Sequence, residues 1–242
     1  MNMELPKIDV PIYELTLPSD GKEIKVRPFL VKEEKLLLIA SESKEPESII
    51  RTTLQVISNC IVDSDVNVNS LPFFDIDYLF IALRAKSLGE SIQLNFKCNN
   101  VVNSELCGNV FPVNIDISNV EVFDLEKPKV VQLTNTTSLR MKFPTYSLMR
   151  MLDEKDNVLE KKTKIMTACI DAIVEKTNVM SAKDFSREQL SSFIDGLTEE
   201  QLKKIQVFTD KMPSFAIKAN QKCKKCGFDH SISYTDFITF FM

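Results

Sequence analysis

The alternation of apolar and polar residues in the first 90 positions predicts a hairpin followed by helices. Residues 12–17 and 23–27 alternate on either side of a Ser19-Asp20-Gly21 turn, which indicates two paired strands. Residues 32–40 suit a short helix. Two later stretches repeat apolar residues at helical spacing: Ile50, Leu54, Ile57 and Ile61, then Phe73, Ile76, Phe80 and Leu83. We therefore expect residues 1–90 to form an N-terminal hairpin plus helices.

Strand-like segments then flank two pairs of cysteines. Residues 91–96 and 110–117 enclose the pair Cys98 and Cys107, and residues 215–219 and 231–234 enclose the pair Cys223 and Cys226. Each pair is expected in a turn, or knuckle, between two strands. Further strands are expected at 120–123, 129–133 and 138–143. These segments predict a zinc-ribbon-like β module made of residues 91–143 with 213–242.

The segment between the two halves of this module has a helical pattern. Met166, Cys169, Ile170 and Ile173 lie at helical spacing, in a helix expected after Asp156. Two capping boxes, Ser186 with Gln189 and Thr198 with Gln201, mark the starts of two more helices, with Gly196 between them. Residues 144–212 are thus expected to be a helical insertion, and the whole chain an α+β protein. Residues 234–242 are expected to form a short aromatic helix or strand.

Composition limits the classes of function. The 242 residues carry a net charge of −4, with an isoelectric point near 5.3. This acidic balance disfavours nonspecific binding to nucleic acid or to an anionic membrane surface. No apolar run is long enough to cross a bilayer, and the start of the chain has no signal-peptide pattern. We therefore expect a cytoplasmic protein with reduced thiols.

In a reduced compartment, the paired cysteines are candidate metal ligands. Zinc prefers four thiolates at structural sites, and glycine after the second cysteine of each pair, Gly108 and Gly227, permits the turn. Nearby lysines would offset the thiolate charge: Lys97, Lys222, Lys224 and Lys225. The sequence predicts one structural Zn²⁺ site with these ligands: Cys98, Cys107, Cys223 and Cys226.

Two alternatives to this site remain open. The four cysteines could be free or core residues without a metal, or His230 could replace a cysteine of the first pair. The remaining cysteines, Cys60 and Cys169, lie in apolar helical patterns and are interpreted as small buried hydrophobic residues.

Other polar residues have ordinary structural explanations. Asp75 and Asp77 are two residues apart at a helix start, so they do not share a face and are expected to favour the helix dipole. Arg84 and Glu90 could make a catalytic or partner contact, but the end of a helix and a surface ion pair account for them at least as well. The chain has one histidine and lacks the motifs of zinc proteases, serine hydrolases and nucleotide-binding loops. We therefore expect no enzyme activity and no small-molecule substrate.

Three motifs resemble a known family. Arg27–Lys35 (RPFLVKEEK), Phe74–Phe80 (FDIDYLF) and Leu83–Glu90 (LRAKSLGE) resemble the baseplate protein family of T-even-type contractile-tailed bacteriophages, which includes hub subunits and hub-assembly factors. The resemblance is close over residues 20–100. Beyond that it is looser, except for a C-terminal cysteine pair before an aromatic ending, here Phe237–Phe241.

The resemblance implies a protein of baseplate hub assembly that works by contact with other hub proteins. It would act in the host cytoplasm, as an assembly factor that leaves or as a hub subunit that stays in the virion, with Phe237, Phe240 and Phe241 as candidate partner contacts. A zinc-ribbon protein that binds nucleic acid is the alternative, favoured only by the lysines beside Cys223. A hydrolase whose zinc has mixed cysteine and histidine ligands is a third hypothesis; it would need an exchangeable water on the metal, which the predicted four-cysteine site does not offer.

Overall fold

The computed structural model groups the chain into two compact units. It describes residues 8–43, 45–118, 120–123, 129–153, 155–210 and 212–234. The first unit contains the chain up to Val68, Phe74–Val122, and the chain from Phe215 on; the second contains Asn69–Phe73 and Phe123–Ser214. Among the described helices, none has the length and apolarity needed to span a membrane.

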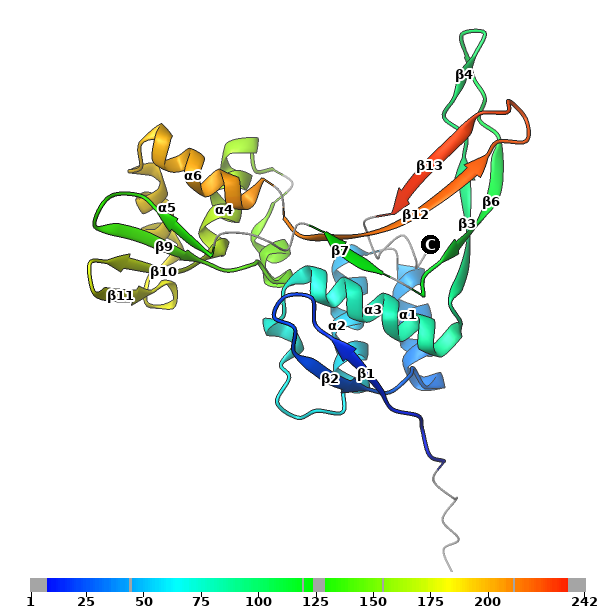
Figure 1. The fold of residues 1–242 in the computed structure, drawn as a ribbon, viewed down its shortest axis with the longest axis horizontal. Helices are drawn as coiled ribbons and strands as arrows, with labels where there is room; N and C mark the ends of the chain where they lie inside the picture. Colours follow the sequence, from blue (N-terminus) through cyan, green and yellow to red (C-terminus); the bar gives the residue numbers. More distant parts are fainter. Residues whose placement is uncertain are drawn as a thin grey trace, which may run out of the picture. The chain divides into compact units, whose positions relative to one another are not determined.

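The first unit begins with the expected hairpin and helices (Figure 1). The strands of the hairpin are antiparallel, with Tyr13 opposite Val26. The elements are β1 (Tyr13–Thr16), β2 (Glu23–Val26), α1 (Val31–Ser43), α2 (Pro46–Cys60), the 3-10 helix η1 (Val68–Ser70) and α3 (Phe73–Leu88). Gly89 follows α3 with a φ of +105°, and its N–H donates to the carbonyl of Ala85. The hairpin and the three helices expected from the sequence are confirmed.

A buried ion pair explains part of the RPFLVKEEK motif. Glu33 is fully buried at the start of α1, and its carboxylate lies 3.0 Å from the guanidinium of Arg27. The backbone N–H of Leu30 donates to the same carboxylate at 2.9 Å. Since a buried charge is costly unless it is paired and hydrogen-bonded, Arg27 and Glu33 depend on each other to connect β2 to α1.

Asp75 has a further role beyond the one its position suggested. Its side chain is fully buried, and it accepts hydrogen bonds from the backbone N–H of Ser19 at 3.0 Å and the hydroxyl of Ser19 at 2.5 Å. It therefore connects the β1–β2 turn to α3, in addition to lying in the first turn of a helix. Burial raises the pKa of Asp75 to about 6.

A surface ion pair forms at the end of α3, but it does not join Arg84 to Glu90. Glu90 pairs instead with Lys86, one helical turn away, at 3.6 Å. Arg84 lies half-buried on α3, and its Nη1 atom has no hydrogen-bond partner among the described residues. A separation of four positions brings Lys86 within reach of Glu90, whereas Arg84 is six positions away.

The strands that carry the cysteines complete the first unit. β3 (Ser91–Lys97) pairs antiparallel with β6 (Val110–Asp116), and the small strands β4 (Val101–Val102) and β5 (Glu105–Leu106) pair between them. β12 (Ser214–Lys222) pairs with β13 (Asp229–Tyr234) on one side and β7 (Glu121–Phe123) on the other. Figure 1 shows the β12–β13 hairpin beside the long β3–β6 hairpin. The strands expected on each side of the cysteine pairs are confirmed.

The second unit is a four-stranded antiparallel sheet covered by helices. The strand order is β11-β10-β9-β8. Leu139 of β9, Ile205 and Phe208 share its buried core with residues of the other strands and helices. Its elements are β8 (Val130–Gln132), β9 (Thr137–Met141), η2 (Tyr146–Met151), α4 (Val158–Cys169), β10 (Ile170–Glu175), β11 (Asn178–Ser181), η3 (Ala182–Asp184), α5 (Arg187–Asp195) and α6 (Glu199–Thr209).

Two expectations for this region need correction. The segment 170–181 is not helical but forms β10 and β11, so 144–212 is not an all-helical insertion. The strands β8 and β9 were expected with the cysteine module, but β9 pairs with β10 and β8 pairs with β9, in the sheet of the second unit. Helix α4 ends at Cys169, where Ile170 has extended backbone angles. The β-branched residues that follow suit a central strand, and helical spacing over four apolar residues did not distinguish the two.

The helix starts expected from the capping boxes are confirmed. Ser186 and Gln189 exchange side chain to backbone hydrogen bonds at the start of α5, and Thr198 and Gln201 do so at the start of α6. Gly196 follows α5 as expected, although its φ of −81° does not require glycine. An aromatic helix or strand was expected over residues 234–242. Beyond Tyr234 this segment lies outside the described residues.

Candidate metal centre

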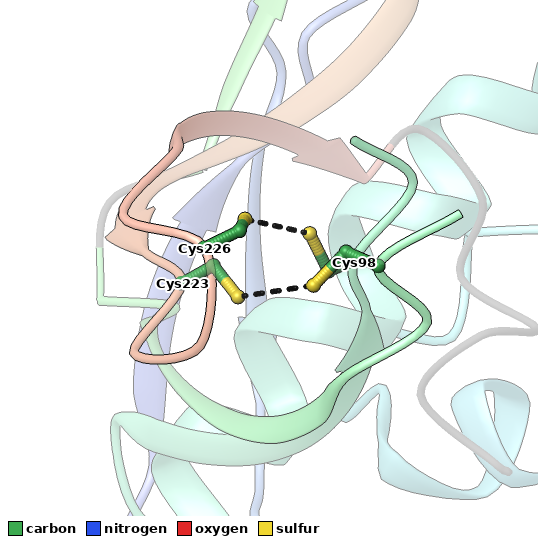
Figure 2. Close-up of side chains that lie close together, drawn as sticks. Cys98, Cys223 and Cys226 are labelled. Carbon is green, nitrogen blue, oxygen red and sulfur yellow. Dashed lines mark hydrogen bonds between the residues drawn. The ribbon is translucent and has the colours of Figure 1, made fainter. Parts of the chain in front are cut away.

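The four cysteines expected as ligands come together in the first unit. Their sulfur atoms all lie within 4.8 Å of one another. Across the two hairpins, the Sγ atoms of Cys98 and Cys226 are 3.7 Å apart (Figure 2), and those of Cys107 and Cys223 are 3.9 Å apart. A tetrahedron with Zn–S bonds of about 2.3 Å has sulfur atoms about 3.8 Å apart, so this spacing suits a metal at the centre.

Local backbone geometry turns the sulfur atoms of each pair to one side. In the first pair, the N–H of Cys98 donates to the carbonyl of Asn109, and the N–H of Gly108 donates to the carbonyl of Cys98. In the second pair, the N–H of Gly227 donates to the carbonyl of Cys223. Gly108 and Gly227 have φ values of +61° and +74°, in the left-handed region where a side chain is strained. The requirement for glycine comes from this backbone conformation.

Side-chain amide groups donate hydrogen bonds to two of the sulfur atoms. The amide nitrogen of Asn100 donates to Cys226, and that of Asn109 donates to Cys223, each at 3.6 Å. Both asparagines follow a cysteine of the first pair by two residues. This regularity is present in the sequence, but these asparagines were not predicted to belong to the site. Their N–H groups stabilise negative charge on cysteine sulfur.

His230 lies beside the cluster, with its Nε2 atom 3.1 Å from Cys98 Sγ. The imidazole is buried among three aromatic rings, with centroid distances of 5.0 Å to Phe96, 6.2 Å to Phe111 and 4.8 Å to Phe228. Because all four cysteines already lie together, His230 is not needed to complete a set of four ligands. Its position suits a hydrogen bond from Nε2–H to the Cys98 sulfur.

The protein environment affects the cysteines of the cluster unequally. The backbone N–H of Cys226 is the largest contribution that lowers the pKa of Cys223, with help from Lys225 N–H and Asn109. The backbone N–H of Phe228 likewise lowers the pKa of Cys226. The second pair is therefore prepared to be deprotonated, which is the form that binds metal.

The neighbouring lysines make one direct contact of note. The ammonium of Lys225 donates to the carbonyl of Cys107 at 3.0 Å and so connects the two loops. Lys97, Lys222 and Lys224 are exposed around the cluster. Four thiolates around a divalent cation leave a net negative charge that such cations would offset.

The other two cysteines do not join the cluster. Cys60 and Cys169 are fully buried, and burial raises the pKa of Cys60 to about 11 and that of Cys169 to about 12. Both therefore remain neutral buried thiols, as expected, although the sulfur of Cys60 also lies 3.7 Å from the guanidinium of Arg27.

The arrangement can hold a thiophilic metal ion between two segments that are distant in sequence. Four soft sulfur ligands of this spacing favour Zn²⁺-type tetrahedral coordination, and four protein ligands leave no position for water or substrate. The site is thus suited to a structural metal. Among the described residues, these four cysteines are the one group of His, Cys, Asp or Glu side chains arranged to hold a metal ion.

Comparison with known proteins gives one match. The family model described as "T4 bacteriophage base plate protein" matches residues 10–242, which include both units and all four cysteines of the cluster. No curated protein and no solved structure matches the chain.

Proposed function

The chain belongs to the T4 bacteriophage base plate protein family, and on this basis we propose that it acts without catalysis in assembling the hub of the tail baseplate. The family implies a place in the tail baseplate and contact with other baseplate proteins. The finer role proposed is that of an assembly factor, which binds hub proteins in the host cytoplasm and then leaves. The alternative within this proposal is a permanent subunit of the hub.

The family match is the observation that carries the proposal. It extends over nearly the whole chain, so the role belongs to both units together. The four-cysteine cluster agrees with a non-catalytic protein, since it offers a metal four ligands and no open position. The lack of an open position also argues against the zinc hydrolase hypothesis.

The metal proposed for the cluster is Zn²⁺, in a module of zinc-ribbon type. The sulfur spacing of 3.7 and 3.9 Å and the amide donors support a tetrahedral thiolate site. Zinc would join the turn after β3 to the turn after β12 and so stabilise a module whose strands form only small sheets. Metal analysis of protein purified without added metal should find about one zinc per chain.

Mass spectrometry of purified phage particles and of infected cells tests the role. Peptides from this chain in infected cells but not in finished particles would support an assembly factor. Peptides in the particles would make the chain a hub subunit. Absence of the chain from both, or failure of the purified chain to bind any baseplate protein of its phage, would overturn the proposal.

A nucleic-acid-binding function has less support. Lys225, one of the lysines that favoured it, is already hydrogen-bonded to the carbonyl of Cys107. The chain as a whole has an excess of acidic residues, which opposes nonspecific attraction to phosphates. Salt-dependent binding to DNA or RNA by the purified chain is the measurement that would favour it.

A further inference from the structure

The second unit contains a groove that shares no residue with the cysteine cluster. Its volume is about 640 Å³, within the range of ligand pockets. Its walls come from the segment after β9, from η2, from the junction of α4 with β10, and from η3 with the start of α5. Several separate segments of the chain therefore converge on one hollow.

The floor of this groove is apolar. Ile170 is fully buried, Leu190 is almost so, and both belong to the core of the second unit. Phe143 and Phe185 pack against that core and also line the groove, together with Leu148. Because the floor is the outer surface of a packed core, it is preformed for an apolar side chain.

The edge of the groove carries an excess of positive charge. Lys142, Lys183 and Arg187 line it, and none of the three forms a salt bridge among the described residues. Asp171 is the one carboxylate that lines the groove, and Arg140 already contacts it at 2.6 Å. The chain as a whole has 34 acidic and 30 basic residues, so average composition does not account for these cations.

We propose that this groove binds a peptide segment of another baseplate protein in which Asp or Glu residues flank a large apolar side chain. The apolar side chain would cover Leu148 and the core surface, and the acidic residues would pair with Lys183 and Arg187. A peptide fits better than nucleic acid, because the aromatic rings of the floor are packed against the core instead of being presented for base stacking. The inference rests on the proposed function for the source of the peptide.

The test uses the full chain and the other baseplate proteins of the same phage, each purified separately. A double variant, Lys183→Gln with Arg187→Gln, removes the two exposed cations of the groove. The matched control, Lys203→Gln with Lys204→Gln, removes two exposed cations of α6 that pair with Glu199 and Glu200 outside the groove. Thermal unfolding confirms that both variants are folded. A photo-cross-linking residue at the exposed position Ser147 identifies the bound segment.

We expect the groove variant to bind its partner about 10-fold more weakly, from two lost charge pairs, and the control to change by less than about 2-fold. The cross-linked segment should contain acidic residues beside an aliphatic or aromatic one. Unchanged affinity of the groove variant, or a cross-link to a basic segment, would overturn the groove proposal and leave the proposed function intact. DNA binding by the wild-type chain that the groove variant loses and the control variant keeps would also overturn the groove proposal. If the wild-type chain binds none of these proteins, the proposed function fails, and the groove proposal fails with it.

Discussion

Replacing Cys223 with serine removes one of the four sulfur ligands and tests whether a metal holds the two cysteine loops together. Cys107 and Cys223 are 116 positions apart in the sequence but have sulfur atoms 3.9 Å apart. Closing a loop of that length restricts the unfolded chain by about 5 kcal/mol on loop-closure arguments. Because a metal link dissociates more readily than a covalent one, we expect Cys223→Ser to lower the free energy of unfolding of the first unit by about 3–5 kcal/mol.

Hydrogen exchange and calorimetry of the metal-loaded protein would measure this loss. Amide protection should fall in β12 and β13, whose turn carries Cys223 and Cys226. It should persist in β9 and β10, because the core of the second unit contains none of the four clustered cysteines. The second unit thus serves as a reference within the same molecule. A zinc chelator should reproduce the effect in the wild-type protein.

Cys60→Ser is the matched control, because Cys60 is a buried cysteine outside the cluster. This variant should retain the metal and its sensitivity to the chelator, whatever it costs locally in packing. The reasoning is refuted if Cys223→Ser retains one zinc per chain. It is also refuted if protection in β12 and β13 does not change when the metal is removed.

Three further measurements follow from particular contacts. His230→Leu removes the partner of the Cys98 sulfur and should weaken zinc binding about 10-fold, while the absorption spectrum of the cobalt-substituted protein remains that of four thiolates; a spectrum that changes its ligand signature would make His230 a ligand. Burial raises the pKa of Asp75 from 3.8 to about 6. The folded state therefore holds this proton more tightly than the unfolded state, and stability falls as the pH rises through that window. Urea unfolding at a series of pH values should show this decline in the wild-type protein, and Asp75→Asn should make the decline smaller by about 1–2 kcal/mol. A variant whose stability falls with pH as steeply as that of the wild type would contradict this prediction. Phe208 is 1% exposed and stacks on Phe143 at 5.5 Å; Phe208→Ala should cost the second unit about 3–5 kcal/mol by calorimetry, and a loss well below this would mean that the core rearranges to fill the space.

Short-range pattern alone determined several parts of this protein. The alternation around Ser19-Asp20-Gly21 was sufficient for the β1–β2 hairpin, and the capping boxes at Ser186 and Thr198 were sufficient for the starts of α5 and α6. The strands beside each cysteine pair were also foreseen. The hairpin and the helix starts depend on residues that are near neighbours in the chain, and each strand beside a cysteine pair is indicated by its own local alternation.

The sequence also indicated the candidate metal ligands. Cysteine pairs followed by glycine, in a chain expected to keep its thiols reduced, indicated the four residues that the structure brings within 4.8 Å. The sequence left open whether His230 would replace one of them. Only the fold shows His230 beside Cys98 and within an aromatic cluster, because that position depends on how the β12–β13 hairpin packs against β3 and β6.

Tertiary structure decided the features that depend on distant partners. Ile170 and Ile173 fit a helix by spacing, but β10 forms because β9 and β11 supply its backbone hydrogen bonds on both sides. Asp75 has the sequence position of a helix-dipole carboxylate, yet its buried hydrogen bonds come from Ser19, 56 positions earlier. The groove edged by Lys183 and Arg187 also exists only where separate segments converge. Periodicity describes which side of an element is apolar, and it does not say which other element will cover that side.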